Sequence, residues 1–213
     1  MSIFYFYNTQ LMTFNDKSSE SVLDYELKCS QIKKKIKEIF NSPEYLSLQT
    51  DRERAIYLNK FIISTAIYNP EIFNERLIYH PATTEEESIN EMHLLLFGNR
   101  AICTGYSLML AQLLNDAGIP AKTVSLKYKD PTEKIKHAVV KLELDGEKLY
   151  CDSTFLRLLW DANQNIDLDS LTLLNEQKFM SLFHKNKTIN GEEEFQSLDE
   201  MLEIIRQSKG QTL

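Results

Sequence analysis

Long hydrophobic runs and secretion signals are missing from this sequence of 213 residues. No apolar run reaches ~18 residues, about the length that a membrane-spanning helix needs. The N-terminus is apolar, but it lacks a basic segment and a small-residue cleavage site, so it does not resemble a signal peptide. We therefore expect no membrane insertion and a cytoplasmic location, with export by a signal-independent route as the alternative.

Basic charge is also scarce. The chain has 24 Lys and Arg against 31 Asp and Glu, which gives a formal net charge of −7. No basic stripe with interleaved aromatic residues is present in the sequence. Nucleic acids and anionic membrane surfaces are therefore not expected as partners.

Cysteine is limited to Cys29, Cys103 and Cys151, with no CxxC motif and no histidine cluster at ligand spacing. An odd number of cysteines in this pattern indicates neither a disulfide framework nor a structural zinc site. We therefore expect a reducing compartment, no metal and no other cofactor.

The first half of the chain has the apolar spacing of helices. Apolar residues in steps of three and four predict helices over 20–40 and 84–98. A capping-box pattern that begins at Thr50 predicts another helix, which ends near Tyr68. The sequence contains no internal repeat and no low-complexity linker.

The second half changes to the alternation that is typical of strands. Strands are predicted over 122–128, 137–144 and 147–154, and an Asp-Gly pair between the last two predicts a two-residue hairpin turn. Peripheral helices are expected over 171–183 and 198–205. Helices that come first and a meander of strands that follows indicate an α+β fold.

Cys103 stands at the start of a predicted amphipathic helix over about 104–117. Gly118 supplies the stop after this helix, and Pro120 prevents its continuation. Unpaired backbone N–H groups and the positive end of the helix dipole would favour a thiolate here, and the same groups could receive an oxyanion. The alternative is that Cys103 is a small buried apolar residue.

The predicted hairpin brings a histidine and a carboxylate to one sheet face. A two-residue turn at Asp145-Gly146 places His137 opposite Thr154, with Asp152 as the diagonal neighbour of His137 at roughly 7–8 Å between backbones. An imidazole–carboxylate hydrogen bond is possible at that separation. Taken one at a time, these side chains could also be an ordinary exposed histidine and a solvated aspartate.

Together, Cys103, His137 and Asp152 have the composition of an acyl-transfer site. A thiol nucleophile is activated by a base, and a carboxylate orients the base. The other cysteines and histidines lack such a context. Cys29 and Cys151 fall on apolar faces and are expected in the core, whereas His80, His93 and His184 have no neighbouring signal.

Four blocks of the sequence, 98–107, 117–121, 137–142 and 149–154, resemble successive blocks of the transglutaminase-like (papain-like thiol) superfamily in order and spacing. The resemblance covers about 55–154. It implies a papain/transglutaminase-like α+β core, in which the nucleophile helix packs on an antiparallel β-meander. We expect a single domain over 1–213, made of this core, an N-terminal helical extension over 1–54 and a C-terminal helical extension over 155–213 that shape the cleft.

The resemblance also implies roles for individual residues. Cys103 would be the nucleophile, His137 the general base and Asp152 the residue that orients the imidazole. Tyr68 corresponds to an aromatic residue that donates to the oxyanion in such proteins, although it could instead cap the end of a buried helix. Tyr replaces Trp at this position, and no acidic calcium loop or extra β-domain is present, which speaks against calcium-dependent crosslinking.

The sequence thus predicts a cysteine-dependent acyl-transfer enzyme with a Cys-His-Asp triad. A peptidase or amide hydrolase that forms a thioester with a protein or peptide substrate is the leading hypothesis. A protein-glutamine deamidase or transglutaminase would use the same groups with another acceptor. An alternative of another class is a non-catalytic protein-binding module on the same fold.

Overall fold

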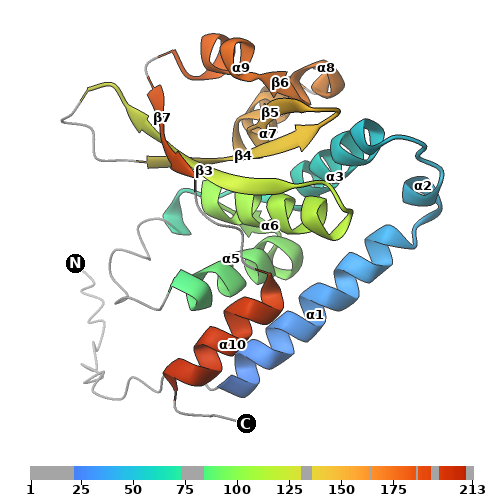
Figure 1. Cartoon of the computed structure of the whole chain (residues 1–213), viewed down its shortest axis with the longest axis vertical. Helices are drawn as coiled ribbons and strands as arrows, with labels where there is room; N and C mark the ends of the chain where they lie inside the picture. The colour runs from blue at the N-terminus through green and yellow to red at the C-terminus, as the bar shows by residue number, and fades with distance from the viewer. Residues whose placement is uncertain are drawn as a thin grey trace, which may run out of the picture.

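The computed structural model describes residues 22–72, 84–130, 136–163, 165–185, 187–192 and 197–209. It has an α+β fold, as the sequence predicted, with helices stacked against an antiparallel sheet (Figure 1). The helices are α1 (Val22–Phe40), α2 (Pro43–Leu46), α3 (Asp51–Thr65), α5 (Thr84–Gly98), α6 (Cys103–Asp116), α7 (Ser153–Ala162), α8 (Leu168–Thr172), α9 (Glu176–Phe183) and α10 (Leu198–Ser208). The strands are β1 (Ile67–Tyr68), β2 (Arg100–Ala101), β3 (Ala121–Tyr128), β4 (Lys136–Leu144), β5 (Glu147–Cys151), β6 (Leu174–Asn175) and β7 (Lys187–Glu192).

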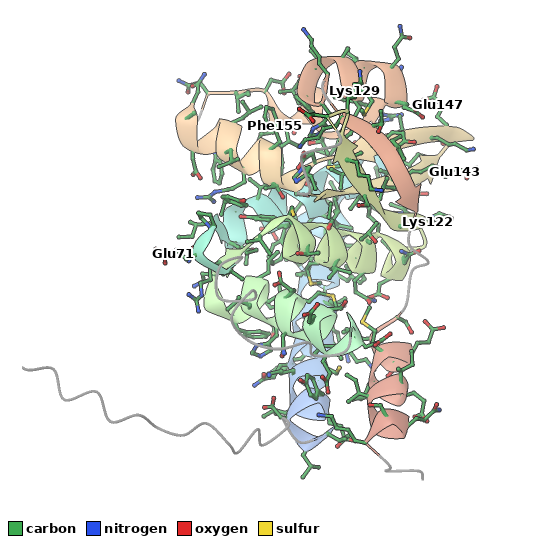
Figure 2. The ribbon with its side chains drawn as sticks, turned by 90° about the vertical axis from the view of Figure 1, so that its left-hand side faces the viewer. Glu71, Lys122, Lys129, Glu143, Glu147 and Phe155 are labelled. Atoms are coloured by element: carbon green, nitrogen blue, oxygen red, sulfur yellow. The ribbon has the colours of Figure 1, made fainter. Side chains whose placement is uncertain are left out.

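The main sheet has the strand order β6-β5-β4-β3-β7, and every neighbouring pair is antiparallel. Helix α6 packs against β3 and β4, α5 lies beneath α6, and α1 and α10 lie at the end of the molecule away from the sheet (Figure 1, Figure 2). Helix α9 packs on β5. Its Phe179 belongs to a separate buried cluster with Val124, Leu126, Val139, Tyr150 and Leu174.

Helix α6 follows the predicted bounds closely, since it begins one residue early, at Cys103. Gly118 has a φ of 81°, which is the left-handed conformation expected after a helix. Its N–H donates to Asn115 O at 2.9 Å, and Ile119 N–H donates to Leu114 O at 2.8 Å. The predicted glycine stop is therefore confirmed.

The hairpin between β4 and β5 has the predicted turn and register. Asp145 and Gly146 both have positive φ, at 53° and 77°, as a type I′ turn requires. The pairing runs from Leu144 opposite Glu147 to Val140 opposite Cys151. It stops there, because the chain leaves the strand after Cys151.

The prediction that this strand continues to residue 154 is wrong, and so is the diagonal sheet contact between His137 and Asp152. Asp152 is the N-cap of α7, and its Oδ1 accepts a hydrogen bond from Phe155 N–H at 2.9 Å. An aspartate at the N-cap satisfies a helix N–H that would otherwise have no partner, so a helix here competes with the strand. Asp152 therefore reaches His137 from a helix start.

The segment after α7 also differs from the prediction. The helix expected over 171–183 is divided into α8, β6 and α9, because Asn175 pairs with β5 and caps α9 through Lys178 N–H at 3.0 Å. The helix expected over 198–205 is confirmed as α10, with its capping box at Ser197. This helix is not peripheral, since its apolar residues Leu198, Met201, Leu202 and Ile205 are buried in the main core.

None of the helices in the described part of the chain is long and apolar enough to cross a membrane.

Candidate active site

Three elements bring the predicted site residues together. Cys103 is the first residue of α6, His137 lies near the start of β4, and Asp152 caps α7. His137 Nε2 and Asp152 Oδ2 are 2.7 Å apart, and the Asp152 side chain is fully buried. Because Nε2 is taken by Asp152, Nδ1 is the ring atom left for the hydrogen bond between His137 and Cys103.

Cys103 has the surroundings of a reactive thiol. Burial alone would raise its pKa, but the hydrogen bond and charge of His137 and the backbone N–H of Ala138 outweigh burial, so the pKa of Cys103 is lowered. Ala138 belongs to β4. The strand that carries the base therefore also stabilises the thiolate, which the helix-based prediction did not include.

His137 and Asp152 stabilise each other as an ion pair. Burial lowers the pKa of His137, but the charge and hydrogen bond of Asp152 and the contact with Cys103 raise it to about 9. Burial raises the pKa of Asp152, but His137, His184 and the N–H of Phe155 hold it well below its usual range. The site therefore shifts the pKa of Cys103 toward the thiolate, that of His137 toward the imidazolium and that of Asp152 toward the carboxylate.

Buried polar contacts fix the start of α7, where Asp152 lies. Ser153 Oγ donates to Asn59 Oδ1 of α3 at 2.7 Å, and Asn59 Nδ2 donates to Thr172 Oγ1 of α8 at 3.2 Å. All of these side chains are buried. Because a buried polar group is costly to leave without a partner, this network holds α7 in one position relative to α3.

Tyr68 lies beside the start of α6 through a short parallel pairing. β1 pairs with β2, which places Tyr68 opposite Ala101, two residues before Cys103. Burial and the charge of Cys103 both raise the pKa of Tyr68, so its hydroxyl is close enough to the thiol for electrostatic coupling. The structure thus places Tyr68 near the start of α6, and its oxyanion role stays a prediction.

His184 is a site residue that the sequence analysis missed. It follows α9, is 4% exposed, and places its Nε2 at 2.9 Å from Asp152 Oδ2. The expectation that His184 has no comparable context is therefore wrong. No local pattern could have indicated this contact, because it joins the end of α9 to a residue 32 positions earlier.

His137, Asp152 and His184 could together hold a metal ion, since one ligand atom of each lies within 4.8 Å of the others. Hydrogen bonds account for the same arrangement. An ionised carboxylate only accepts hydrogen bonds, so both imidazoles donate Nε2–H to Asp152 Oδ2. A metal at this place would have to displace both protons.

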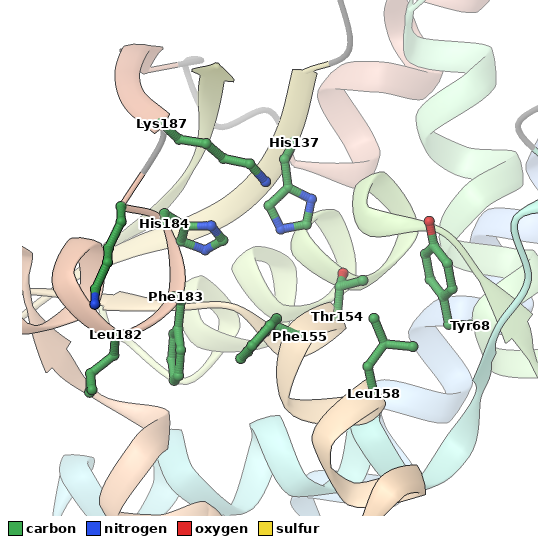
Figure 3. A pocket seen from close by; sticks show the side chains of 10 residues that line it. Tyr68, His137, Thr154, Phe155, Leu158, Leu182, Phe183, His184 and Lys187 are labelled. Atoms are coloured by element: carbon green, nitrogen blue, oxygen red, sulfur yellow. The ribbon is translucent and has the colours of Figure 1, made fainter. Parts of the chain in front are cut away.

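A cavity of ≈ 610 Å³ opens beside these residues (Figure 3). Tyr68 and Lys187 lie on either side of His137 in this view. Burial lowers the pKa of Lys187, although the charges of Asp152 and Cys103 act in the opposite direction. The apolar part of the lining comes from α7 and α9, through Phe155, Leu158, Leu182 and Phe183.

Several solved structures are similar to this chain at low sequence identity. No family model and no curated protein matches the sequence. A solved structure of a TGase is similar at 16% identity over 68% of this chain and 35% of that chain, with a TM-score of 0.42. A candidate protease from Parabacteroides distasonis is similar at 16% identity over 59% of this chain and 26% of that one, with a TM-score of 0.35. A candidate cysteine protease from Cytophaga hutchinsonii is similar at 14% identity over 79% of this chain and 51% of that one, with a TM-score of 0.40.

The names of these structures describe those proteins alone. The chain spans between 26% and 51% of their lengths. At such identities and TM-scores, an activity has to be argued from the residues of the site.

Proposed function

We propose that this chain is a cysteine-dependent acyl-transfer enzyme, and above all a hydrolase of peptide or carboxamide bonds. The observation that carries the proposal is that His137 pairs with Asp152 at 2.7 Å and also lowers the pKa of Cys103. A thiol with a lowered pKa, joined to a base that a buried carboxylate orients, is the arrangement that nucleophilic catalysis requires.

In the first half of the proposed reaction, the Cys103 thiolate attacks the carbonyl carbon of the substrate. A sulfur–carbon bond forms, and the carbonyl electron pair moves to the oxygen. Tyr68 and the backbone N–H groups at the start of α6 would donate to this oxyanion. The His137 imidazolium then gives its Nδ1 proton to the leaving amine, the carbon–nitrogen bond breaks, and a thioester remains.

In the second half, water resolves the thioester. His137, now neutral, removes a proton from the water as the oxygen attacks the thioester carbon. The carbon–sulfur bond breaks, the acid product leaves, and the thiolate returns. Asp152 keeps the Nε2–H tautomer throughout, so Nδ1 always faces the sulfur.

The proposed partner is a protein or peptide, because the cavity combines an apolar wall with polar side chains such as Tyr68, His137 and Lys187. Leu158 and Leu182 line this wall and are 44% and 51% exposed. They would contact an apolar side chain of the substrate next to the scissile bond.

Peptide mass spectrometry after incubation with a proteome-derived peptide mixture tests the proposal. We expect new peptide termini with the unaltered chain, no products with Cys103→Ala, and unchanged products with Cys29→Ala, which removes a core thiol instead. The products should persist after prolonged treatment with EDTA.

Other outcomes would contradict hydrolysis in distinguishable ways. Conversion of glutamine to glutamate without new termini would assign the deamidase reaction, and isopeptide crosslinks would assign amine transfer. Binding without any covalent change, equal in the Cys103→Ala variant, would favour the non-catalytic module. Loss of activity on chelation, with recovery on adding zinc, would replace the thiol mechanism by a metal-activated water.

A further inference from the structure

We propose that His184 is a positioning residue that fixes Asp152, and through it directs His137 at Cys103. The inference deepens the proposed function, because it concerns the same site. It starts from the two imidazoles that share one carboxylate oxygen, His137 at 2.7 Å and His184 at 2.9 Å.

The carboxylate of Asp152 is held at both oxygens. Oδ1 accepts a hydrogen bond from the backbone N–H of Phe155. This is the contact by which Asp152 caps α7, and it fixes one end of the carboxylate. Oδ2 is the oxygen that has to face His137, and the Nε2–H of His184 is its second donor. With this donor present, turning the carboxylate away from His137 would break two hydrogen bonds.

Within the described residues, the hydrogen bond of the His184 ring is the one to Asp152. Its Nδ1 is buried and has no hydrogen-bond partner among them, and the polar ring beside it is that of His137, with centroids 5.4 Å apart. A ring buried for packing alone would gain more from an apolar residue of the same size, because the unmatched nitrogen costs free energy.

Aromatic neighbours hold the ring in place. The ring centroids of Phe179, Phe183 and Phe155 lie 4.9, 6.2 and 6.3 Å from that of His184. Phe179 in turn stacks on Tyr150 of β5 at 5.4 Å. Helix α9 therefore packs on β5 and on the His184 ring. The His184 ring in turn contacts Asp152.

The rate of Cys103 alkylation by iodoacetamide tests this role without a known substrate. His184→Phe keeps an aromatic ring among the phenylalanines and removes the donor, whereas His184→Gln keeps an N–H near the position of Nε2. We expect His184→Phe to slow alkylation at neutral pH about tenfold, the lower end of the loss seen when hydrogen-bond partners that orient metal-ligating histidines are removed. His184→Gln should recover most of the rate.

A double-mutant cycle separates positioning from mere structural support. If His184 acts through Asp152, then His184→Phe should cause no further loss in the Asp152→Asn background. Circular dichroism and thermal unfolding would show that each variant is folded at the assay temperature. If His184→Phe does not fold, His184→Met serves in its place, since it also lacks the donor.

Three results would overturn the inference. These are an unchanged alkylation rate in folded His184→Phe, a folded His184→Gln that is as slow as His184→Phe, or losses that simply add in the Asp152→Asn background. The proposed hydrolysis fails by a different result, since the absence of peptide products would leave the alkylation rates untouched.

Discussion

At the scale of the residue, Asp152 performs three tasks with two oxygens. It caps α7 through Oδ1 and accepts hydrogen bonds from His137 and His184 through Oδ2. The predicted contact between Asp152 and His137 is present, but not with the predicted geometry, because β5 ends at Cys151, three residues before the predicted end. The contact between His137 and Asp152 could be predicted from the two residue types and the hairpin turn. The cap that Asp152 forms could not be predicted in this way, because it depends on the residues after Asp152 forming α7.

The raised pKa of His137 predicts how stability depends on pH. Burial lowers the pKa of this group, but Asp152 and, to a smaller extent, Cys103 raise it from 6.5 to about 9 in the folded protein. A raised folded pKa contributes stability that is fully present below the unfolded value and is lost as pH rises through the folded one. His137 should therefore stabilise the fold most near pH 6.5 and below, and progressively less as pH approaches 9.

Urea unfolding of His137→Gln against its parent across this pH range measures the effect. Both chains should carry Cys103→Ala, because the lowered pKa of Cys103 contributes stability of the opposite pH dependence. We expect the difference in the free energy of unfolding to shrink as the pH rises. A difference that is constant or grows would show that Asp152 does not hold His137 as an imidazolium.

At the scale of the element, the position of α6 depends on a close approach at Gly105. A Cβ at this residue would lie 2.9 Å from Glu91 Oε2, 3.2 Å from Ala101 Cβ and 3.3 Å from Glu91 O. Glu91 Oε2 is the end of a flexible side chain, but Glu91 O and Ala101 Cβ are fixed to the backbones of α5 and β2, so these two atoms cannot move aside easily. Gly105 therefore lets the start of α6, with Cys103, lie against α5.

Gly105→Ala should destabilise the fold by about 1–3 kcal/mol, which is typical of overpacking. An unhindered Gly→Ala change in a helix would instead stabilise it by about 1 kcal/mol. Gly98→Ala is the matched control, because its Cβ meets mainly the flexible end of the Leu94 side chain. We expect a smaller change there, measured by urea unfolding.

The rate of Cys103 alkylation provides a second readout for this pair. Gly105→Ala should slow it, because α6 must shift at the turn that carries the thiol, whereas Gly98→Ala should leave it within about twofold. Equal effects of the two variants on stability and on the rate would contradict the close approach of α5 and α6.

Elements with a local signal could be predicted, and those with only distant partners could not. Apolar spacing and caps predicted α1, α3, α5, α6 and α10, and the Asp-Gly turn predicted the β4–β5 hairpin. β6 and β7 form the edges of the sheet, where pairing with β5 and β3 decides their conformation. β1 and β2 are two residues each, too short for any periodicity.

At the scale of the whole molecule, the two extensions have different places. The C-terminal part contributes α7, α9 and β7, whose residues line the cavity. The described N-terminal residues 22–40 form α1, which packs on α5 and α10 and contributes no lining residue to that cavity (Figure 2). Of the two extensions expected to shape the cleft, the C-terminal one therefore does so in the described part of the chain. The division of 1–213 as a single domain stays a prediction.

The central claim is that Cys103 is a nucleophile activated by His137. Limited alkylation with iodoacetamide between pH 5 and 9, followed by peptide mass spectrometry, tests it most directly, with Cys29 and Cys151 as internal references. Burial raises the pKa of Cys29 to about 11 and that of Cys151 far above its usual value, whereas that of Cys103 is lowered.

We predict that Cys103 is labelled first, that its rate rises through a pKa below the usual thiol value of 9.0, and that His137→Gln returns this pKa to 9.0 or above. Labelling of Cys29 or Cys151 at the same rate in the folded protein, or a Cys103 profile that His137→Gln leaves unchanged, would contradict the account.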